Sequence, residues 1–443
     1  MRFFSVFFAR FFARFFDKNF TFFNHLKNKR EVIAWSFYDF ANQPFTTIII
    51  TFLYAPFFTD VICASDEING IGLWSLAISI TAIFVAFISP IIGAISDTGG
   101  FRKFFFILST WTCIIATGCL FFFKEGDVYS AFVYFIIANI GFELGSVICN
   151  SYLPEITEKK NFGKISGFAW GLGFLGGLLS LIFLFSLMII LPMILINFID
   201  LELKIVRFST IFVAVWFCVF SIPAFYLVRE KKSEKLTKKH IKKSFSAIFN
   251  TFNDIKKYKK IVRFLVARLF YNDALITIFA LGGAYAIETL DFTLTETLIL
   301  GIVLNVFACL GSFYFGRIED SLGPKFCIEI SIITLFFAVT LAFFAPYFNN
   351  ILIGKSIFWL AGILIGIMTG PSQSCSRSLM ARLTPEEKTN EFFGFYAFTG
   401  KATAFLGPFL FALLSVYSAQ MGLLVVILFF LIGYIIFRPL NVD

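Results

Sequence analysis

The sequence predicts an all-α integral membrane protein in which twelve transmembrane helices form two related halves of six. The chain of 443 residues is 58% hydrophobic, with a mean hydropathy of +0.85. Apolar runs of about 20 residues recur along it, the length that crosses roughly 30 Å of hydrocarbon. Because lipid offers backbone amides no hydrogen-bond partner, such runs must form helices. A short charged pattern that occurs twice indicates the two halves.

The apolar runs divide into six expected helices on each side of a polar linker. The first six are expected at residues 32–58, 71–96, 104–123, 128–152, 165–190 and 206–228. The second six are expected at residues 262–287, 296–317, 326–348, 351–376, 391–416 and 420–438. Residues 191–200 either extend the fifth helix or dip at the outer surface.

Four segments follow from this division. Residues 1–30 carry a phenylalanine stripe at helical spacing with arginines between, which is typical of a cytoplasmic or interfacial helix. A transit peptide is the alternative reading of that segment. The N-terminal half covers residues 31–228, a basic cytoplasmic linker covers 229–261, and the C-terminal half covers 262–443.

The duplicated pattern is a charged turn between the second and third helix of each half. Its first copy contains Gly93, Asp97, Gly100 and Arg102, and its second, 223 residues later, contains Gly316, Asp320, Gly323 and Lys325. The first glycine lets two helices approach closely. The aspartate can accept from a neighbouring helix N-terminus or a nearby arginine, and the second glycine permits a sharp turn. Two copies in two sets of spans predict the internal repeat of a transporter.

Basic residues collect in alternate loops, which fixes the expected orientation. The loops on one side carry only Lys124, Lys204, Arg207 and Lys355, and nearly all other lysines and arginines flank the opposite ends of the helices. This bias places both termini and the linker in the cytoplasm. The same basic residues account for the net charge of +9, and because they serve to orient the chain in the membrane, we expect no nucleic-acid partner.

Polar and ionisable residues inside the expected helices are candidates for a substrate or coupling site, since each costs roughly 2.5–3.5 kcal/mol to insert. They are Asp39, Asn42, Gln43, Glu143, Asn272, Asp273, Gln373 and Lys401. Lys401 is expected to pair with Asp273 or Asp39, in a bridge that either breaks during the cycle or is purely structural. Pro44 is expected to kink the first helix beside its polar residues.

Six segments give the chain a specific resemblance. They are WSFYDFANQPFTTII, NSYLPEI, SGFAWGLGFLGG, RLFYNDALITI, SQSCSRSLMARLTP and EFFGFYAFTGKATAFLGP. In this order, over residues 31–440, the sequence resembles the vacuole-effluxer-like branch of the major facilitator superfamily. That branch comprises autophagy-related vacuolar amino-acid exporters and bacterial "unknown major facilitator" proteins. The duplicated turn resembles the superfamily's gating loop, although the usual arginine after the aspartate is Thr98 and Ser321 here.

The resemblance implies the major facilitator fold, with helices one, four, seven and ten around a central cavity. It implies a monomeric secondary transporter that moves a small polar solute by alternating access. An amino acid or similar metabolite is the expected substrate, export the expected direction, and a proton one candidate coupling ion. The alternatives are an exporter of another metabolite or drug, or a non-transporting membrane sensor.

The sequence gives no support for an enzyme. It has two histidines and neither CxxC nor HExxH, so we expect no metal, and it has no phosphate-binding P-loop. No cofactor is expected, and the expected partners are the solute, the coupling ion and the lipid bilayer. The expected location is a bacterial inner membrane.

Overall fold

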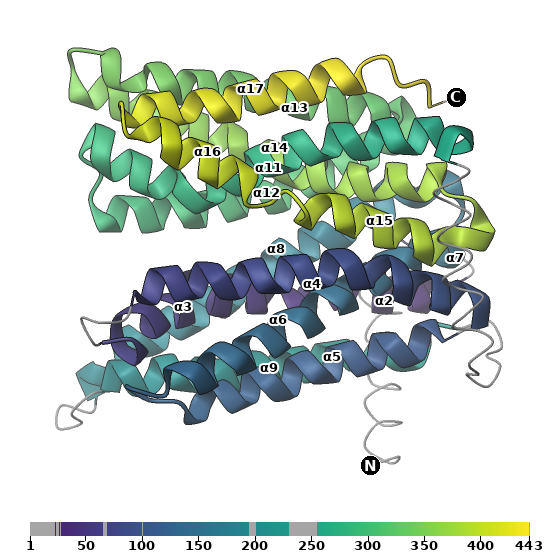
Figure 1. Cartoon of the computed structure of the whole chain (residues 1–443), viewed down its shortest axis with the longest axis horizontal. Coiled ribbons are helices and arrows are strands. Elements are labelled where there is room, and N and C mark those ends of the chain that lie inside the picture. The colour runs from purple at the N-terminus through teal and green to yellow at the C-terminus, as the bar shows by residue number, and fades with distance from the viewer. Residues whose placement is uncertain are drawn as a thin grey trace. The chain divides into compact units, whose positions relative to one another are not determined.

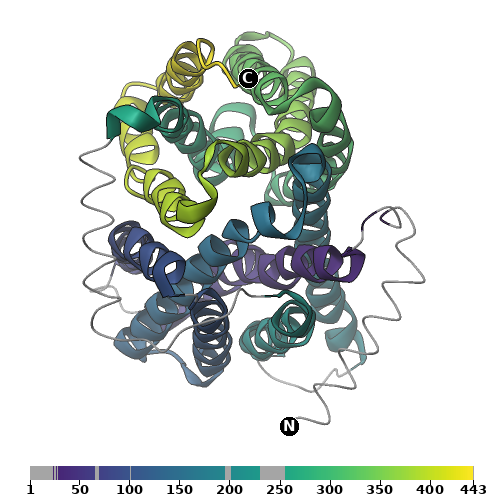
Figure 2. The same ribbon diagram turned by 90° about the vertical axis from the view of Figure 1, so that its right-hand side faces the viewer.

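The computed structural model describes residues 28–64, 69–99, 101–194, 201–229 and 255–442, with Phe23 and Leu26. These residues are almost entirely helical and include no strand. The expectations for most of the first thirty residues, for Gly100 and for most of the linker lie outside the described residues. Figures 1 and 2 show the helices from the side and from their ends.

The twelve predicted spans are confirmed. Eleven helices in the described ranges are long and apolar enough to cross a membrane, and a bent pair near the N-terminus supplies the twelfth. The first six spans are formed by α2 (Lys29–Pro44) with α3 (Tyr54–Phe57), α4 (Gly70–Gly99), α5 (Arg102–Cys119), α6 (Val128–Ser151) with the short α7 (Leu153–Ile156), α8 (Phe162–Ile194) and α9 (Leu201–Leu227). The second six are formed by α11 (Lys259–Leu290), α12 (Leu294–Leu322), α13 (Pro324–Phe344), α14 (Ile351–Leu383), α15 (Thr389–Lys401) with α16 (Leu406–Ser415), and α17 (Ala419–Phe437).

The first span changes its winding at Pro44 and bends nine residues later, at Leu53. α2 ends at Pro44, and π-helical turns continue the chain through Phe45–Phe52. The axis changes by 41° between Lys29–Phe52 and Tyr54–Ile62. The expected kink at Pro44 is therefore a change of winding only. The bend at Leu53 lies in the turn before Pro56, and a proline removes an amide donor and crowds the turn that precedes it.

The eleventh span is interrupted, which the sequence did not predict. α15 ends at Lys401, and α16 starts at Leu406. Between them, the amide of Ala404 donates to the carbonyl of Lys401 over 3.2 Å, and that of Leu406 donates to Thr403 over 2.7 Å. These three-residue bonds tighten the winding, as 3₁₀ turns do. The break exposes the polar end of α15 in mid-span.

Contacts within the chain divide it into two units. Unit 1 comprises most of the N-terminal half. Unit 2 comprises the C-terminal half together with Ala86–Ala94 of α4 and Glu158–Gly171, which contains the beginning of α8. α4 and α8 therefore contribute to both units. The predicted boundaries of the linker stay predictions.

Candidate functional site

In unit 1, the first copy of the turn is held by an arginine. Arg102 is buried, and its Nη1 lies 3.1 Å from Oε2 of Glu155 at the end of the fourth span. Its Nη2 lies 4.0 Å from Oδ1 of Asp97, and its guanidinium stacks 4.7 Å from the ring centre of Tyr152. Arg102 thus joins the turn to the end of the fourth span.

In unit 2, Asp320 of the second copy caps the N-terminus of α8. Its Oδ1 accepts from the amide of Gly163 at 2.9 Å and its Oδ2 from the amide of Lys164 at 3.0 Å. These are the second and third residues of α8, whose amides have no partner within their own helix. Arg382 lies 3.5 Å from the same carboxylate. The predicted role of this aspartate as an acceptor for a neighbouring helix N-terminus is confirmed.

Glycines of the turn pack two helix pairs backbone to backbone within unit 2. A methyl group added to Gly167 of α8 would lie 2.6 Å from Cα of Gly316 on α12. One added to Gly394 of α15 would lie 2.6 Å from Cα of Pro90 on α4, and one added to Gly93 would lie 2.9 Å from the amide nitrogen of Glu391. We call these two contacts, α8 against α12 and α15 against α4, the paired seams. Each involves the first glycine of one copy of the pattern.

The turn that follows each aspartate is best seen in the second copy. Gly323 has a φ of +85° between α12 and α13, a conformation that favours glycine. Lys325 is the second residue of α13, and its Nζ lies 3.8 Å from Oε1 of Glu329. Lys325 therefore binds within its own helix, and the cation beside Asp320 comes from α14.

A buried polar network lies one turn further along α8. Arg377 of α14 donates from Nε to the hydroxyl of Ser166 at 2.9 Å and from Nη2 to its carbonyl at 2.8 Å. The hydroxyl of Ser166 donates to the carbonyl of Ser374 at 2.7 Å. Both side chains are almost completely buried, and Trp170 lies 5.7 Å from the guanidinium. Because a buried cation needs such partners, this network can only form while α8 lies against α14.

Glu319 is a buried acid that sequence reasoning missed. Its side chain is 0% exposed, Oε1 accepts from the hydroxyl of Ser378, and Oε1 lies 3.7 Å from Arg382. Its Oε2 has no hydrogen-bond partner. The signal was available, because Glu319 directly precedes Asp320 in the second copy.

The seventh span holds a buried carboxylate whose oxygens make no hydrogen bond. Asp273 is 0% exposed, and neither of its carboxylate oxygens makes a hydrogen bond. The buried hydroxyl of Thr403, in the break of the eleventh span, also makes no hydrogen bond, and Thr403 and the cation of Arg268 are the groups that act electrostatically on Asp273. Next to Asp273, the carbonyl oxygen of the Asn272 side chain accepts from Gln373 of α14 at 3.1 Å. Unit 2 thus brings three of the predicted site residues onto neighbouring helices.

The expected pair between Lys401 and Asp273 is not formed in this structure, because neither carboxylate oxygen of Asp273 makes a hydrogen bond, and its formation at another stage of the cycle stays a prediction. The reason is the break in the span: Lys401 ends α15 instead of continuing into a helix alongside Asp273. A cation at this place suits the negative end of a helix. The other expected pair, with Asp39, stays a prediction.

Arg268, one turn before Asn272, is fixed by the eleventh span. Its Nη1 donates to the carbonyl of Tyr396 at 2.9 Å, and its guanidinium lies 3.6 Å from the centre of that ring. Gly400 makes room for it, since a methyl group there would lie 2.8 Å from Nη1. The arginine therefore braces α15 against α11, just before the break.

In unit 1, the predicted residues of the first span face two other helices. Nδ2 of Asn42 lies 3.5 Å from the hydroxyl of Ser146 on α6, the helix that also carries Glu143. Asp39 and Gln43 lie against the glycine-rich middle of α8, where added methyl groups would come within 3.5 Å and 3.2 Å of their side chains. Sequence alone could not distinguish packing from function for these glycines, and here they allow close packing.

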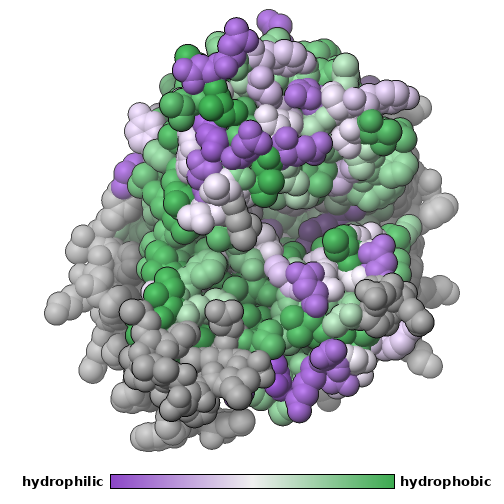
Figure 3. All heavy atoms as spheres, turned by 90° about the vertical axis from the view of Figure 1, so that its left-hand side faces the viewer, coloured by the Kyte–Doolittle hydropathy of each residue, from purple (hydrophilic) through white to green (hydrophobic). Residues whose placement is uncertain are grey.

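The surface of the described residues agrees with a protein embedded in a membrane. Many large apolar side chains are exposed on the spans, and in Figure 3 hydrophobic residues cover broad areas between hydrophilic patches. Exposure of this extent marks a surface that contacts lipid. Among the described residues, no three histidine, cysteine or acidic side chains are placed to hold a metal.

Comparison with known proteins identifies the chain as a relative of membrane transporters. Residues 61–443 match the family described as "Vacuole effluxer Atg22 like". The chain is 26% identical over 408 residues to the uncharacterized MFS-type transporter YxiO of Bacillus subtilis, covering 91% of this chain and 93% of the relative. It is 21% identical to autophagy-related protein 22 of Kluyveromyces lactis, covering 94% of both chains.

The fold also matches solved transporters. The crystal structure of a bacterial homologue of the iron transporter ferroportin, in an outward-facing state, has a TM-score of 0.70 at 14% identity, covering 93% of this chain and 98% of that one. The fold is therefore that of the major facilitator superfamily, and the chain is a multi-pass membrane transporter. It belongs to the Atg22-like vacuole effluxer family.

Proposed function

We propose that the protein is a secondary active transporter that exports an amino acid or a similar small zwitterion by alternating access. One observation carries the substrate class: Asp273 is a fully buried carboxylate with no hydrogen-bond partner in a helix of the transport bundle. Leaving a charged group buried and unpaired is costly unless a ligand completes it. A substrate ammonium group supplies both the missing charge and the missing donors.

The neighbouring side chains suit the remainder of an amino acid. Asn272 and Gln373 present amide groups that donate and accept, and the Thr403 hydroxyl lies in a break where helix ends meet. Lys401 is the candidate partner for the substrate carboxylate, because a cation at a helix end can turn toward an anion. Asp39, Asn42, Gln43 and Glu143 are the corresponding candidates in unit 1.

We further propose that the paired seams form the cytoplasmic gate. Lys388 lies in the 3₁₀ turn that leads into α15, and basic loops mark the cytoplasmic side. In alternating access, these backbone contacts would open when the segments of α4 and α8 that belong to unit 2 move away from α15 and α12. In this scheme both termini are cytoplasmic, the protein resides in a bacterial inner membrane, and Asp273, Asp39 or Glu143 carries a coupled proton.

Counterflow in proteoliposomes tests the proposal. Vesicles loaded with one unlabelled amino acid should accumulate the same labelled amino acid, and Asp273→Asn should reduce the initial rate at least tenfold. The control is Asp291→Asn, since Asp291 is exposed at the end of α11 and has a φ of +51° that asparagine adopts readily. Full counterflow by Asp273→Asn would refute its role in binding. Absence of counterflow for all twenty amino acids would refute the substrate class.

Coupling is tested with the same vesicles. An imposed pH gradient should change the rate of net amino-acid movement severalfold in the wild type. If movement is indifferent to the gradient, the protein does not couple transport to protons.

A further inference from the structure

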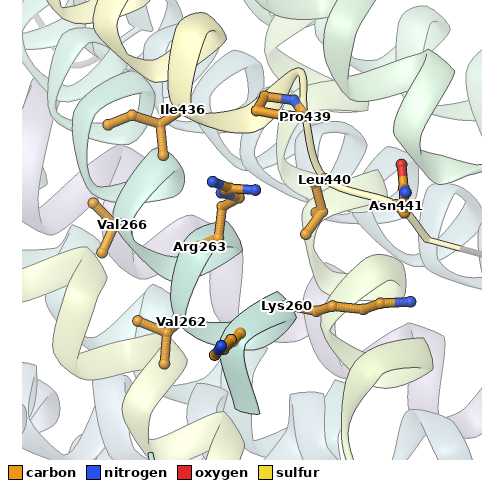
Figure 4. A pocket seen from close by; sticks show the side chains of 9 residues that line it. Lys260, Val262, Arg263, Val266, Ile436, Pro439, Leu440 and Asn441 are labelled. Carbon is orange, nitrogen blue, oxygen red and sulfur yellow. The ribbon is translucent and has the colours of Figure 1, made fainter. Parts of the chain in front are cut away.

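Outside the transport site, a basic groove lies where the seventh span begins and the twelfth ends. It has a volume of about 770 Å³. Its walls are formed by Lys259, Lys260, Val262, Arg263, Val266, Ile436, Pro439, Leu440 and Asn441. Figure 4 shows Arg263 between the two helices, facing the chain that follows α17. All of these residues belong to unit 2.

The charge in this groove is of one sign. Among the described residues, its lining contains three cations and no acid. Lys259 and Arg263 are one helical turn apart, so they lie on one face of α11. Both are exposed, and neither makes an ion pair within the described part of the chain. The groove therefore presents cations to an anion from outside the protein.

The position of these cations adds to the argument. Lys259 is the first residue of α11, and the first turn of that helix contains no acidic residue. A helix N-terminus carries a partial positive charge, so cations there are unfavourable by themselves and an anion is favourable. A bound anion would compensate both the side chains and the helix end.

One side of the groove is lined by apolar side chains. Val262 and Val266 line it from α11, and Ile436 faces them from α17. Val266 is 39% exposed, although it lies inside an apolar span. The two helices are held together beside the groove by Phe264 and Phe437, whose ring centres are 6.2 Å apart. The groove thus combines a cationic mouth with an apolar wall, which matches an amphiphile better than a water-soluble ion.

The length of the span places the mouth at the membrane surface. α11 has 32 residues, which extend about 48 Å at ~1.5 Å per residue. This exceeds the roughly 30 Å of hydrocarbon, so its charged first turns lie among the lipid headgroups. Basic pockets between spans at this depth are a known form of anionic-lipid site.

We propose that this groove binds an anionic phospholipid. The phosphate lies against Lys259, Lys260 and Arg263, and an acyl chain runs along Val262, Val266 and Ile436. The bound lipid joins the first turn of α11 to the end of α17 and so stabilises the C-terminal half. This inference does not depend on which solute is transported.

Thermal unfolding of the full-length protein in a neutral detergent tests the proposal. Phosphatidylglycerol should raise the unfolding temperature of the wild type by several degrees, and phosphatidylcholine should not. In the double variant Lys259→Gln/Arg263→Gln the apparent affinity for phosphatidylglycerol should fall about 30-fold, the equivalent of about 2 kcal/mol for two cations. Native mass spectrometry of the same samples counts the lipid molecules that remain bound.

The matched control removes two exposed lysines elsewhere in unit 2. Lys159→Gln/Lys160→Gln changes the net charge equally and should keep the wild-type response. An equal loss in this control would overturn the proposal in favour of a diffuse surface potential. A stabilisation by glycerol phosphate or inorganic phosphate as large as that by the lipid would also overturn it, because the site would then bind a free anion.

A third variant keeps the test decisive if the charge variants fold poorly. Val266→Trp leaves every charge in place but fills the apolar wall. It should weaken the response to phosphatidylglycerol at least fivefold. An unchanged response would show that no acyl chain occupies the groove, which would overturn the proposal.

Discussion

Replacing Asp320 by alanine should open the contact between the beginning of α8 and α12. Asp320 accepts from two amides of α8, at 2.9 and 3.0 Å, and lies 3.5 Å from Arg382. Loss of a helix cap costs roughly 0.5–2 kcal/mol, and a hydrogen bond to a charged group contributes about 1.5–3 kcal/mol. The Asp320 side chain is 17% exposed, so hydrogen bonds from water to the exposed amides offset part of this loss of free energy. We therefore expect a loss of about 2 kcal/mol from the closed state, or about 30-fold in the equilibrium between closed and open.

Hydrogen–deuterium exchange measures this directly, because the two capped amides are the ones that become exposed. In Asp320→Ala, a peptide covering Phe162–Trp170 should exchange up to about 30-fold faster, and in Asp320→Asn, which keeps one acceptor oxygen, by less. The control is Lys325→Gln in the same turn. Its pair with Glu329 at 3.8 Å is partly exposed and contributes only about 0.3–0.5 kcal/mol. Unchanged exchange in Asp320→Ala, or an equal increase in Lys325→Gln, would refute the capping argument.

Three further variants separate packing from binding, each measured by thermal unfolding. Gly167→Ala should lower the unfolding temperature by several degrees, since its new methyl group would lie 2.5 Å from the carbonyl oxygen of Ser312. Gly118→Ala, whose new methyl group would have its nearest neighbour at 3.7 Å, should leave the temperature unchanged. Equal effects of the two variants would contradict the close-contact explanation. Arg268→Lys should destabilise by about 1–2 kcal/mol, because lysine cannot both stack on Tyr396 and bond its carbonyl; wild-type stability would show that neither contact matters. Asp273→Asn should keep or raise the unfolding temperature without substrate, because it removes an unpaired buried charge; a marked loss would indicate a structural role.

The spans could be predicted because their signal is local. A run of apolar residues long enough to cross the bilayer has one stable conformation there, so both the number and the order of helices follow from composition. The bend of the first span is expected at Pro44 and lies instead at Leu53, in the turn before Pro56, since proline acts on its own preceding turn. The close approach at Gly93 and Gly316 could be predicted because the pattern occurs twice in equivalent places.

The interruption after Lys401 could not be predicted, because its cause is tertiary. The residues 402–405 contain neither proline nor glycine, so the sequence suggests a continuous helix. In the structure, Gly400 packs on the guanidinium of Arg268, and Gly407 packs on the backbone of Asp273. These two contacts fix the chain on both sides of the break. The absence of a Lys401–Asp273 pair from this structure follows from the break.

Each copy of the turn is bound by a charged residue at the end of another helix, and the sign of that charge differs between the copies. α7 ends at Ile156 and α14 at Leu383, and each is followed by a 3₁₀ turn that leads into the next span. Glu155 and Arg382 therefore occupy equivalent places, each one residue before its helix ends. In the first copy the residue at this place is an acid, which binds Arg102 of the turn. In the second copy it is a base, which binds Asp320 of the turn directly.

The opposite charges at these two equivalent positions account for the departures from the family pattern. The arginine that usually follows the aspartate is Thr98 in one copy and Ser321 in the other. The missing cation is supplied by Arg102 from within the first turn and by Arg382 from α14 in the second. Since Arg382 neutralises Asp320, Lys325 is not required there and pairs with Glu329 instead. A cation near each aspartate is thus kept by the fold, although the position that provides it differs between the halves.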